Sequence, residues 1–122
     1  MLKHASLVAM TLVSLGLLQA PAFAHADLKL SNPRAESSVV DVKEIRLGFS
    51  EGVNPKFSGI DLKDEAGKMV ATGPALVDSK NKKELVVPVS AKLSPGNYTV
   101  EWHAVSDDSH RVKGRFSFKV TQ

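Results

Sequence analysis

Two of the four histidines stand at positions that suit metal binding, His25 near the start of the chain and His110 near its end. His25 directly follows an Ala-Phe-Ala sequence that ends at Ala24, so cleavage there would make it the first residue. A histidine with a free α-amine offers two nitrogens, the amine and the ring Nδ1, which can close a chelate on one metal ion. Both can be neutral donors near pH 7, because the α-amino pKa is about 7.7–8.0 and that of histidine is about 6.5.

His110 lies in a polar segment that we expect to form the turn between the last two strands. Its imidazole would supply a third nitrogen, and the carboxylate of Asp108 would complete a planar set of three nitrogens and one oxygen. Tetragonal coordination of this kind suits Cu(II), whereas zinc, the weaker candidate, prefers a tetrahedron. Asp107 competes with Asp108, but the Asp-x-His spacing favours Asp108. The plain alternative is that Asp108 and His110 form a solvated turn and that His25 follows the cleavage site by chance.

The composition excludes several classes of function. The chain has 122 residues, with 16 lysines and arginines, 13 acidic residues and no cysteine. Disulfides, thiolate zinc sites, iron–sulfur clusters and cysteine nucleophiles are therefore excluded. The net charge of +3 is mild and the charges are interleaved, which argues against nucleic-acid binding. Met69 is the only methionine after residue 24, so a thioether site for Cu(I) has little support. Ser109 lacks the neighbouring base and acid of a serine hydrolase.

Residues 1–24 have the pattern of a secretory signal peptide. Lys3 makes the start basic, Ala5–Phe23 contains no charged residue, and the segment ends with small residues up to Ala24. An uncleaved membrane anchor is the alternative, but a serine, a glutamine and a proline within the segment weaken a membrane-spanning helix. We expect cleavage after Ala24, a mature domain at residues 25–122, and export to the periplasm of a bacterium.

The mature chain is dominated by short runs in which apolar and polar residues alternate, separated by Gly, Pro, Asn and Asp. The runs predict strands at Leu28–Leu30, Glu44–Ser50, Ile60–Leu62, Met69–Ala71, Leu85–Val89, Tyr98–Ala104 and Arg115–Val120. About seven strands in one small domain predict an all-β, immunoglobulin-like antiparallel sandwich with one buried face per sheet. Pro88 is expected at a strand end or a sheet edge.

Two further features fix the register of the strand Tyr98–Ala104. The segment Leu93–Tyr98 resembles the tyrosine corner of immunoglobulin-like sandwiches, in which the tyrosine hydroxyl bonds to nearby backbone; an ordinary Pro-Gly turn is the alternative. Trp102, the sole tryptophan, is expected in the core. His103 should then face outward as a solvated residue rather than a ligand. Strand ends and turns would gather His25, Asp108 and His110 at one end of the sandwich.

Eight short motifs follow one another in residues 25–122. They are His25–Leu28, Ser31–Pro33, Phe49–Glu51, Leu93–Tyr98, Trp102–Ser106, Asp108–His110, Gly114 and Phe116–Val120. No single motif is specific, but the whole set, in this order and behind a signal peptide, is. In these motifs the chain resembles the CopC-type periplasmic copper-binding proteins, including the short forms called YobA.

The resemblance implies a small Greek-key sandwich or barrel that is not an enzyme and binds one Cu(II) ion per mature chain. Carried over by motif, the copper ligands are His25, His110 and Asp108, and Glu51 lies near them and orients or hydrogen-bonds a ligand. The implied role is copper homeostasis or resistance, by sequestering or delivering the ion as a monomer. The implied partner is an inner-membrane copper-transport protein of CopD type. The methionine-rich Cu(I) loop of some members is absent.

Two other functions compete with this hypothesis. An amino-terminal histidine with a second histidine also resembles the copper brace of oxidative polysaccharide-cleaving enzymes. A carboxylate in the copper plane and the scarcity of spare aromatic residues argue against that reading. The other rival is a metal-free immunoglobulin-like interaction module of the cell envelope, which would be indifferent to the state of its N-terminus.

Overall fold

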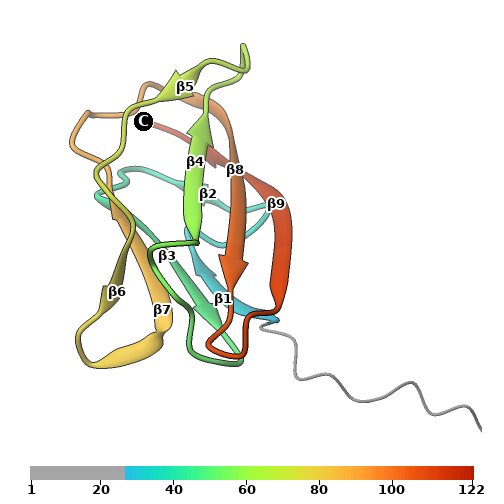
Figure 1. Ribbon diagram of the computed structural model, residues 1–122. Helices are drawn as coiled ribbons and strands as arrows, with labels where there is room; N and C mark the ends of the chain where they lie inside the picture. The colour runs from blue at the N-terminus through green and yellow to red at the C-terminus, as the bar shows by residue number, and fades with distance from the viewer. Residues whose placement is uncertain (1–26) are drawn as a thin grey trace, which may run out of the picture.

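The computed structural model describes residues 27–122, which form nine strands (Figure 1). The strands are β1 (Leu28–Asn32), β2 (Ser38–Val39), β3 (Glu44–Phe49), β4 (Gly59–Lys63), β5 (Met69–Val70), β6 (Leu76–Asp78), β7 (Asn81–Pro88), β8 (Gly96–Val105) and β9 (Arg111–Val120). Within this part of the chain, no helix is long and apolar enough to cross a membrane.

The strands form two sheets that pack into a sandwich, which confirms the predicted all-β fold class. One sheet has the order β1-β3-β7-β6 and the other has the order β2-β9-β8-β4-β5. All pairings are antiparallel except the short parallel pairing of β2 with β9. Figure 1 shows the turn between β8 and β9 at the same end of the sandwich as the start of the described chain. This end holds Asp108 and His110, the two predicted ligands that lie within the described residues.

Alternating side chains from both sheets fill the core. Strand β3 contributes Ile45, Leu47 and Phe49, and the fully or nearly buried positions on β8 include Trp102. The Phe49 and Trp102 rings meet edge to face, with centroids 5.3 Å apart and planes at 66°, so they join the two sheets. Each such buried side chain stabilises the fold by about 1.5–3 kcal/mol. The prediction that Trp102 is a core residue is confirmed.

The tyrosine corner is also confirmed. The Tyr98 hydroxyl donates a hydrogen bond of 2.7 Å to the carbonyl oxygen of Ser94, and its ring stacks on Phe118 with centroids 5.7 Å apart. The corner fixes the start of β8, so the inward positions continue at alternate residues along the strand. His103 consequently lies on the outer face and is exposed, as predicted.

The first predicted strand differs in detail from the observed one. Leu28 and Leu30 were expected on one face, but the pairing of β1 with β3 shifts between them. This irregularity leaves Leu28 packed against the core, while Leu30 lies over Gly48 and is 49% exposed. A β-bulge reverses the face of the residues that follow it, and simple alternation does not reveal one.

The remaining differences concern strand ends and short strands. Strands β2 and β6 have two and three residues, too few to show a period of two, and the sequence did not predict them. Strand β7 begins at Asn81, earlier than predicted. The prediction missed this start because the first residues of the strand are polar and exposed. The strand ends at Pro88, as expected for a residue without a backbone N–H.

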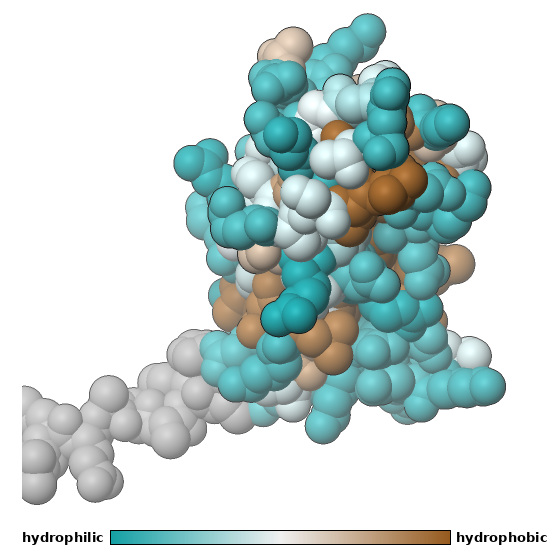
Figure 2. All heavy atoms as spheres, turned by 180° about the vertical axis from the view of Figure 1, so that it is seen from behind, coloured by the Kyte–Doolittle hydropathy of each residue, from teal (hydrophilic) through white to brown (hydrophobic). Residues whose placement is uncertain are grey.

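Figure 2 shows a largely hydrophilic surface with hydrophobic patches between the polar residues.

Candidate metal centre

A tight turn between β8 and β9 holds the two described candidate ligands. The Ser106 N–H donates to the His110 carbonyl oxygen, and the Ser109 N–H donates to the Ser106 carbonyl oxygen, both at 2.9 Å. Ser109 adopts a left-handed conformation with φ of 71°, which reverses the chain direction between Asp108 and His110. This local geometry brings the side chains of Asp108 and His110 to the same side of the turn.

The side chains of Asp108 and His110 form a hydrogen-bonded pair above a buried serine. The Ser106 hydroxyl donates to Asp108 Oδ1, and the other carboxylate oxygen, Oδ2, lies 2.9 Å from His110 Nδ1. Ser106 is 2% exposed, whereas the Asp108 and His110 side chains are 45% and 37% exposed. The serine therefore fixes the pair from the core side, and the pair itself is accessible from solvent.

These contacts keep Asp108 in the form that binds cations. The hydrogen bond from Ser106, followed by the interaction with His110, holds the pKa of the Asp108 carboxyl below its usual value. The carboxylate is therefore ionised throughout the neutral pH range. A carboxylate and an imidazole are both suitable ligands for Cu(II).

The separation of the two side chains also fits metal binding. Two donors with bonds of roughly 2.0 Å that meet at a right angle lie about 2.8 Å apart. The observed 2.9 Å between His110 Nδ1 and Asp108 Oδ2 matches that spacing. A metal ion that binds both atoms would replace the proton that they share.

The loop after β3 is tied directly to this turn. Val53 forms an isolated bridge with Ser106, and the Asp107 N–H donates to the Gly52 carbonyl oxygen at 3.1 Å. The Asp107 carboxylate occupies the space where Gly52 would carry a side chain. The structure therefore separates the two aspartates: Asp107 faces the loop, and Asp108 faces His110. Half-buried Glu51 lies in the same loop, immediately before Gly52.

The beginning of the described chain is anchored to the same loop. The Asp27 N–H donates to Ser50 Oγ, and the Ser50 N–H donates to the Asp27 carbonyl oxygen, both at 2.9 Å. His25, the remaining predicted ligand, lies outside the described residues, as does the predicted signal peptide 1–24. Among residues 27–122, no three side chains of ligand type are grouped closely enough to hold a metal ion.

Ser106 is a functional candidate to which the sequence reading assigned no role. A signal for it was present, because the inward positions of β8 run through Tyr98, Val100, Trp102 and Ala104. Extending that alternation by two residues places a polar side chain at an inward position. Such a hydroxyl needs a hydrogen-bond partner, and the nearby Asp-x-His sequence supplies one.

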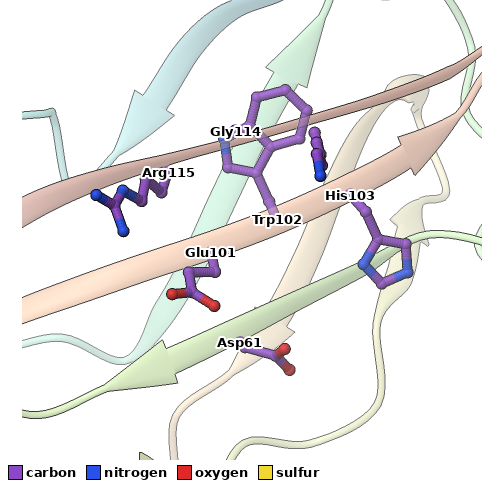
Figure 3. Close-up of a pocket in the computed structure, with 7 residues that line it drawn as sticks. Asp61, Glu101, Trp102, His103, Gly114 and Arg115 are labelled. Carbon is purple, nitrogen blue, oxygen red and sulfur yellow. The ribbon is translucent and has the colours of Figure 1, made fainter. Parts of the chain in front are cut away.

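A separate hollow of about 480 Å³ lies on the outer face of the five-stranded sheet (Figure 3). Its lining includes Asp61 on β4, Glu101 and His103 on β8, and Arg115 on β9. The Glu101 carboxylate is paired with Lys63 at 3.1 Å. His103 lies over Gly59, and it is not part of the Asp108–His110 pair. The hollow is therefore distinct from the candidate metal centre.

The comparisons of this chain with known proteins by sequence and by structure agree with each other. The CopC domain model matches residues 28–121. The chain is 37% identical over 113 residues to protein YobA of Escherichia coli K12, covering 92% of this chain and 91% of that protein. It is 38% identical over 105 residues to copper resistance protein C of Escherichia coli, covering 81% and 83%.

Two crystal structures show the same architecture. CopC from Methylosinus trichosporium OB3b superimposes with a TM-score of 0.73 and 32% identity, over 79% of this chain and 93% of that one. PcoC from Escherichia coli, described as a methionine-rich copper resistance protein, gives a TM-score of 0.72 and 35% identity, over 80% and 100%.

Proposed function

Because the chain belongs to the CopC domain family, we propose that it binds one Cu(II) ion and sequesters or delivers it in copper homeostasis or resistance. Its relatives are named as copper resistance proteins and not for a catalysed reaction, and we propose a binding role rather than an enzymatic one. The protein acts as a monomer in the periplasm. It transfers its ion to, or receives it from, an inner-membrane copper-transport protein of CopD type, as the family resemblance implies.

The proposed working protein is the domain at residues 25–122, released from the signal peptide 1–24. The basic start, the uncharged segment and the small residues before His25 support this division. The family match and the first strand both begin at residue 28. The folded domain therefore leaves room for a cleavage site at Ala24.

The proposed ligands are the amine and ring of His25, the carboxylate of Asp108 and the imidazole of His110. The observation that carries the proposal is the Asp108–His110 pair, with its 2.9 Å donor separation and its support from Ser106. Asp27 provides the link to His25, because its backbone is bonded to Ser50 in the loop that contacts the turn. Two residues span at most about 7 Å of backbone, a length that would let His25 reach the metal centre from Asp27.

The donor set favours Cu(II) over Cu(I). Nitrogen and carboxylate donors suit the divalent ion, whereas Cu(I) prefers thiolates and thioethers. Met69 is exposed on β5, and Figure 1 shows β5 at the end of the sandwich opposite the β8–β9 turn. It is therefore in no position to assist Asp108 and His110. Glu51 is proposed to act from the loop by orienting a ligand rather than by binding the ion.

A copper titration of protein purified after export tests this function. Mass spectrometry first establishes that the chain begins at His25. The exported protein should bind one equivalent of Cu(II), and His110→Ala should weaken binding on the order of 100-fold, since it removes a ligand and its oriented partner. His103→Ala is the matched control and should bind as the parent does, because that ring lies on the outer face. Equal affinities for both variants would refute the assignment of His110.

A further inference from the structure

The first part of β9 is an open edge of the five-stranded sheet. Strand β2 pairs with β9 only at Ser38↔Lys119 and Val39↔Val120. On the side away from β8, no described strand pairs with Arg111–Phe116. Figure 1 shows β9 at the margin of the sheet, running up from the turn that holds the candidate metal centre. An unpaired strand edge is a template for another extended segment.

The hydrogen bonds at the far end of β9 identify which backbone groups face this edge. The Lys119 N–H donates to the Ser37 carbonyl oxygen at 2.8 Å, and the Ser117 carbonyl oxygen accepts from Glu36 at 2.7 Å. Backbone direction alternates along a strand, and β9 pairs with β8 without a register shift. The N–H and C=O groups of residues 111, 113 and 115 therefore point to the open edge.

The side chains of the same three residues form a row of exposed cations. Arg111, Lys113 and Arg115 occupy alternate positions and are all exposed. No ion pair joins these three residues to a carboxylate within residues 27–122, and the nearby Glu101 is paired with Lys63. The row opposes pairing between two copies of the chain, because like charges across a strand pair are destabilising. It favours a partner strand that carries carboxylates.

The opposite side of this β9 segment is apolar and only partly covered. Val112, Gly114 and Phe116 alternate with the cations and are half-buried. Gly114 lies against the Trp102 indole, where an added Cβ would be 2.6 Å from a ring carbon, so the backbone stays close to the core. An added strand would find cations on one face and apolar contacts on the other.

We propose that the Arg111–Phe116 edge of β9 is a docking site for an extended acidic segment of a partner protein, which adds to the sheet as a further strand. The partner carries carboxylates at alternate positions opposite Arg111, Lys113 and Arg115, and apolar side chains between them. Strand addition supplies affinity through the main chain and specificity through the alternating side chains. Since Arg111 follows His110 directly, the docked partner begins beside the candidate metal centre. The docking itself does not require copper.

A peptide-binding experiment tests this proposal. The probe is a labelled nine-residue peptide of alternating glutamate and valine, added to ¹⁵N-labelled protein purified after export. Binding should slow the solvent exchange of the amides of Arg111, Lys113 and Arg115. The amides of Val112 and Gly114 face β8 and should change little, which distinguishes strand addition from general charge attraction.

Two controls make the result decisive. Lys113→Glu should weaken the peptide about tenfold, as attraction at the centre of the row becomes repulsion, while Lys92→Glu in a distant exposed loop should have little effect. The spectrum of Lys113→Glu away from β9 reports whether that variant is folded. A peptide of the same composition with its glutamates grouped at one end should bind more weakly. No binding, equal binding of the grouped peptide, or binding without protection of the three amides would overturn the proposal.

Discussion

Two clusters in this molecule both pair acidic side chains with a basic one, but they differ in chemistry. At the β8–β9 turn, Asp108 is paired with His110 at 2.9 Å. On the outer face of the other sheet, Arg46 binds Asp78 and Glu84 at 2.7 Å each and Glu44 at 3.2 Å. Each cluster lowers the pKa of an aspartate, Asp108 through Ser106 and His110, and Asp78 mainly through Arg46.

The difference lies in the positive partner. Arg46 remains protonated, and its acidic neighbours, Asp78 first, raise its pKa further, so its carboxylates keep a permanent cationic partner. The imidazole of His110 is a ligand type that binds metal ions in its neutral form, so a metal ion can take the place of the proton that it shares with Asp108. A group of carboxylates is therefore not by itself a metal site. Carboxylates can bind a metal ion only where the ion can displace the group with which they are already paired.

Exchanging each aspartate for asparagine separates the two roles and should give the largest effect. Asp108→Asn should weaken Cu(II) binding on the order of 100-fold, because it removes a charged ligand while keeping its shape. Asp78→Asn should leave copper affinity unchanged and lower stability instead. Competitive copper titration and urea unfolding measure the two quantities. A copper defect in Asp78→Asn as large as that in Asp108→Asn would erase the distinction between the clusters.

Removing the arginine tests the structural cluster. Arg46→Met should lower the free energy of unfolding by about 1–2 kcal/mol, since three carboxylates lose their shared donor on a partly solvated face. Arg46→Lys should recover only part of this loss, because an ammonium group does not reproduce the guanidinium fork. Copper affinity should be the same in both variants. Unchanged stability of Arg46→Met would show that the network contributes nothing to the fold.

Ser106→Ala tests how far support from the core contributes to the metal centre. The substitution removes the donor to Asp108 Oδ1, so we expect copper affinity to fall about tenfold and the pKa of Asp108 to rise towards its usual value. Carbon NMR of the carboxylate and copper titration measure these changes. Ser94→Ala is a suitable control, because only the backbone carbonyl of Ser94 serves the tyrosine corner. If Ser106→Ala leaves affinity intact, Asp108 is positioned by the turn alone.

The pH dependence of stability should show the smallest effect. The Asp78 carboxyl has a lower pKa in the folded state than in the unfolded state, where it is about 3.9. Its contribution to stability is therefore complete above the unfolded pKa and is lost as the pH falls through the folded pKa. The stability difference between the parent and Asp78→Asn should therefore be full at pH 6 and shrink at more acid pH. Urea unfolding across this range measures it. A difference that stays constant with pH would mean that charge at Asp78 is not its source.

The sequence predicted the parts of the fold that depend on local pattern. Alternation identified β3, β8 and β9, and the Pro-Gly-Asn-Tyr segment identified the tyrosine corner. It could not predict the bulge in β1 or the short strands β2 and β6, which depend on pairing with residues far along the chain.

The same division applies to the charged clusters. The Asp-x-His spacing selected Asp108 over Asp107, and the structure places only Asp108 against His110. The Arg46 cluster left no such signal, because its members come from three strands and meet only through strand register. His25, Asp108, His110 and Glu51 all remain predictions as copper-site residues.

The measurement that tests the central claim most directly compares two forms of the protein that differ only at the N-terminus. One begins at His25, and the other carries a single additional alanine before it. Electron paramagnetic resonance and competitive titration with one equivalent of Cu(II) report the donor set and the affinity. We predict nitrogen-rich tetragonal copper in the first form, and in the second a changed spectrum and severely weakened binding, since the chelating amine has moved. Identical spectra and affinities in the two forms would contradict a copper site built on the amine of His25.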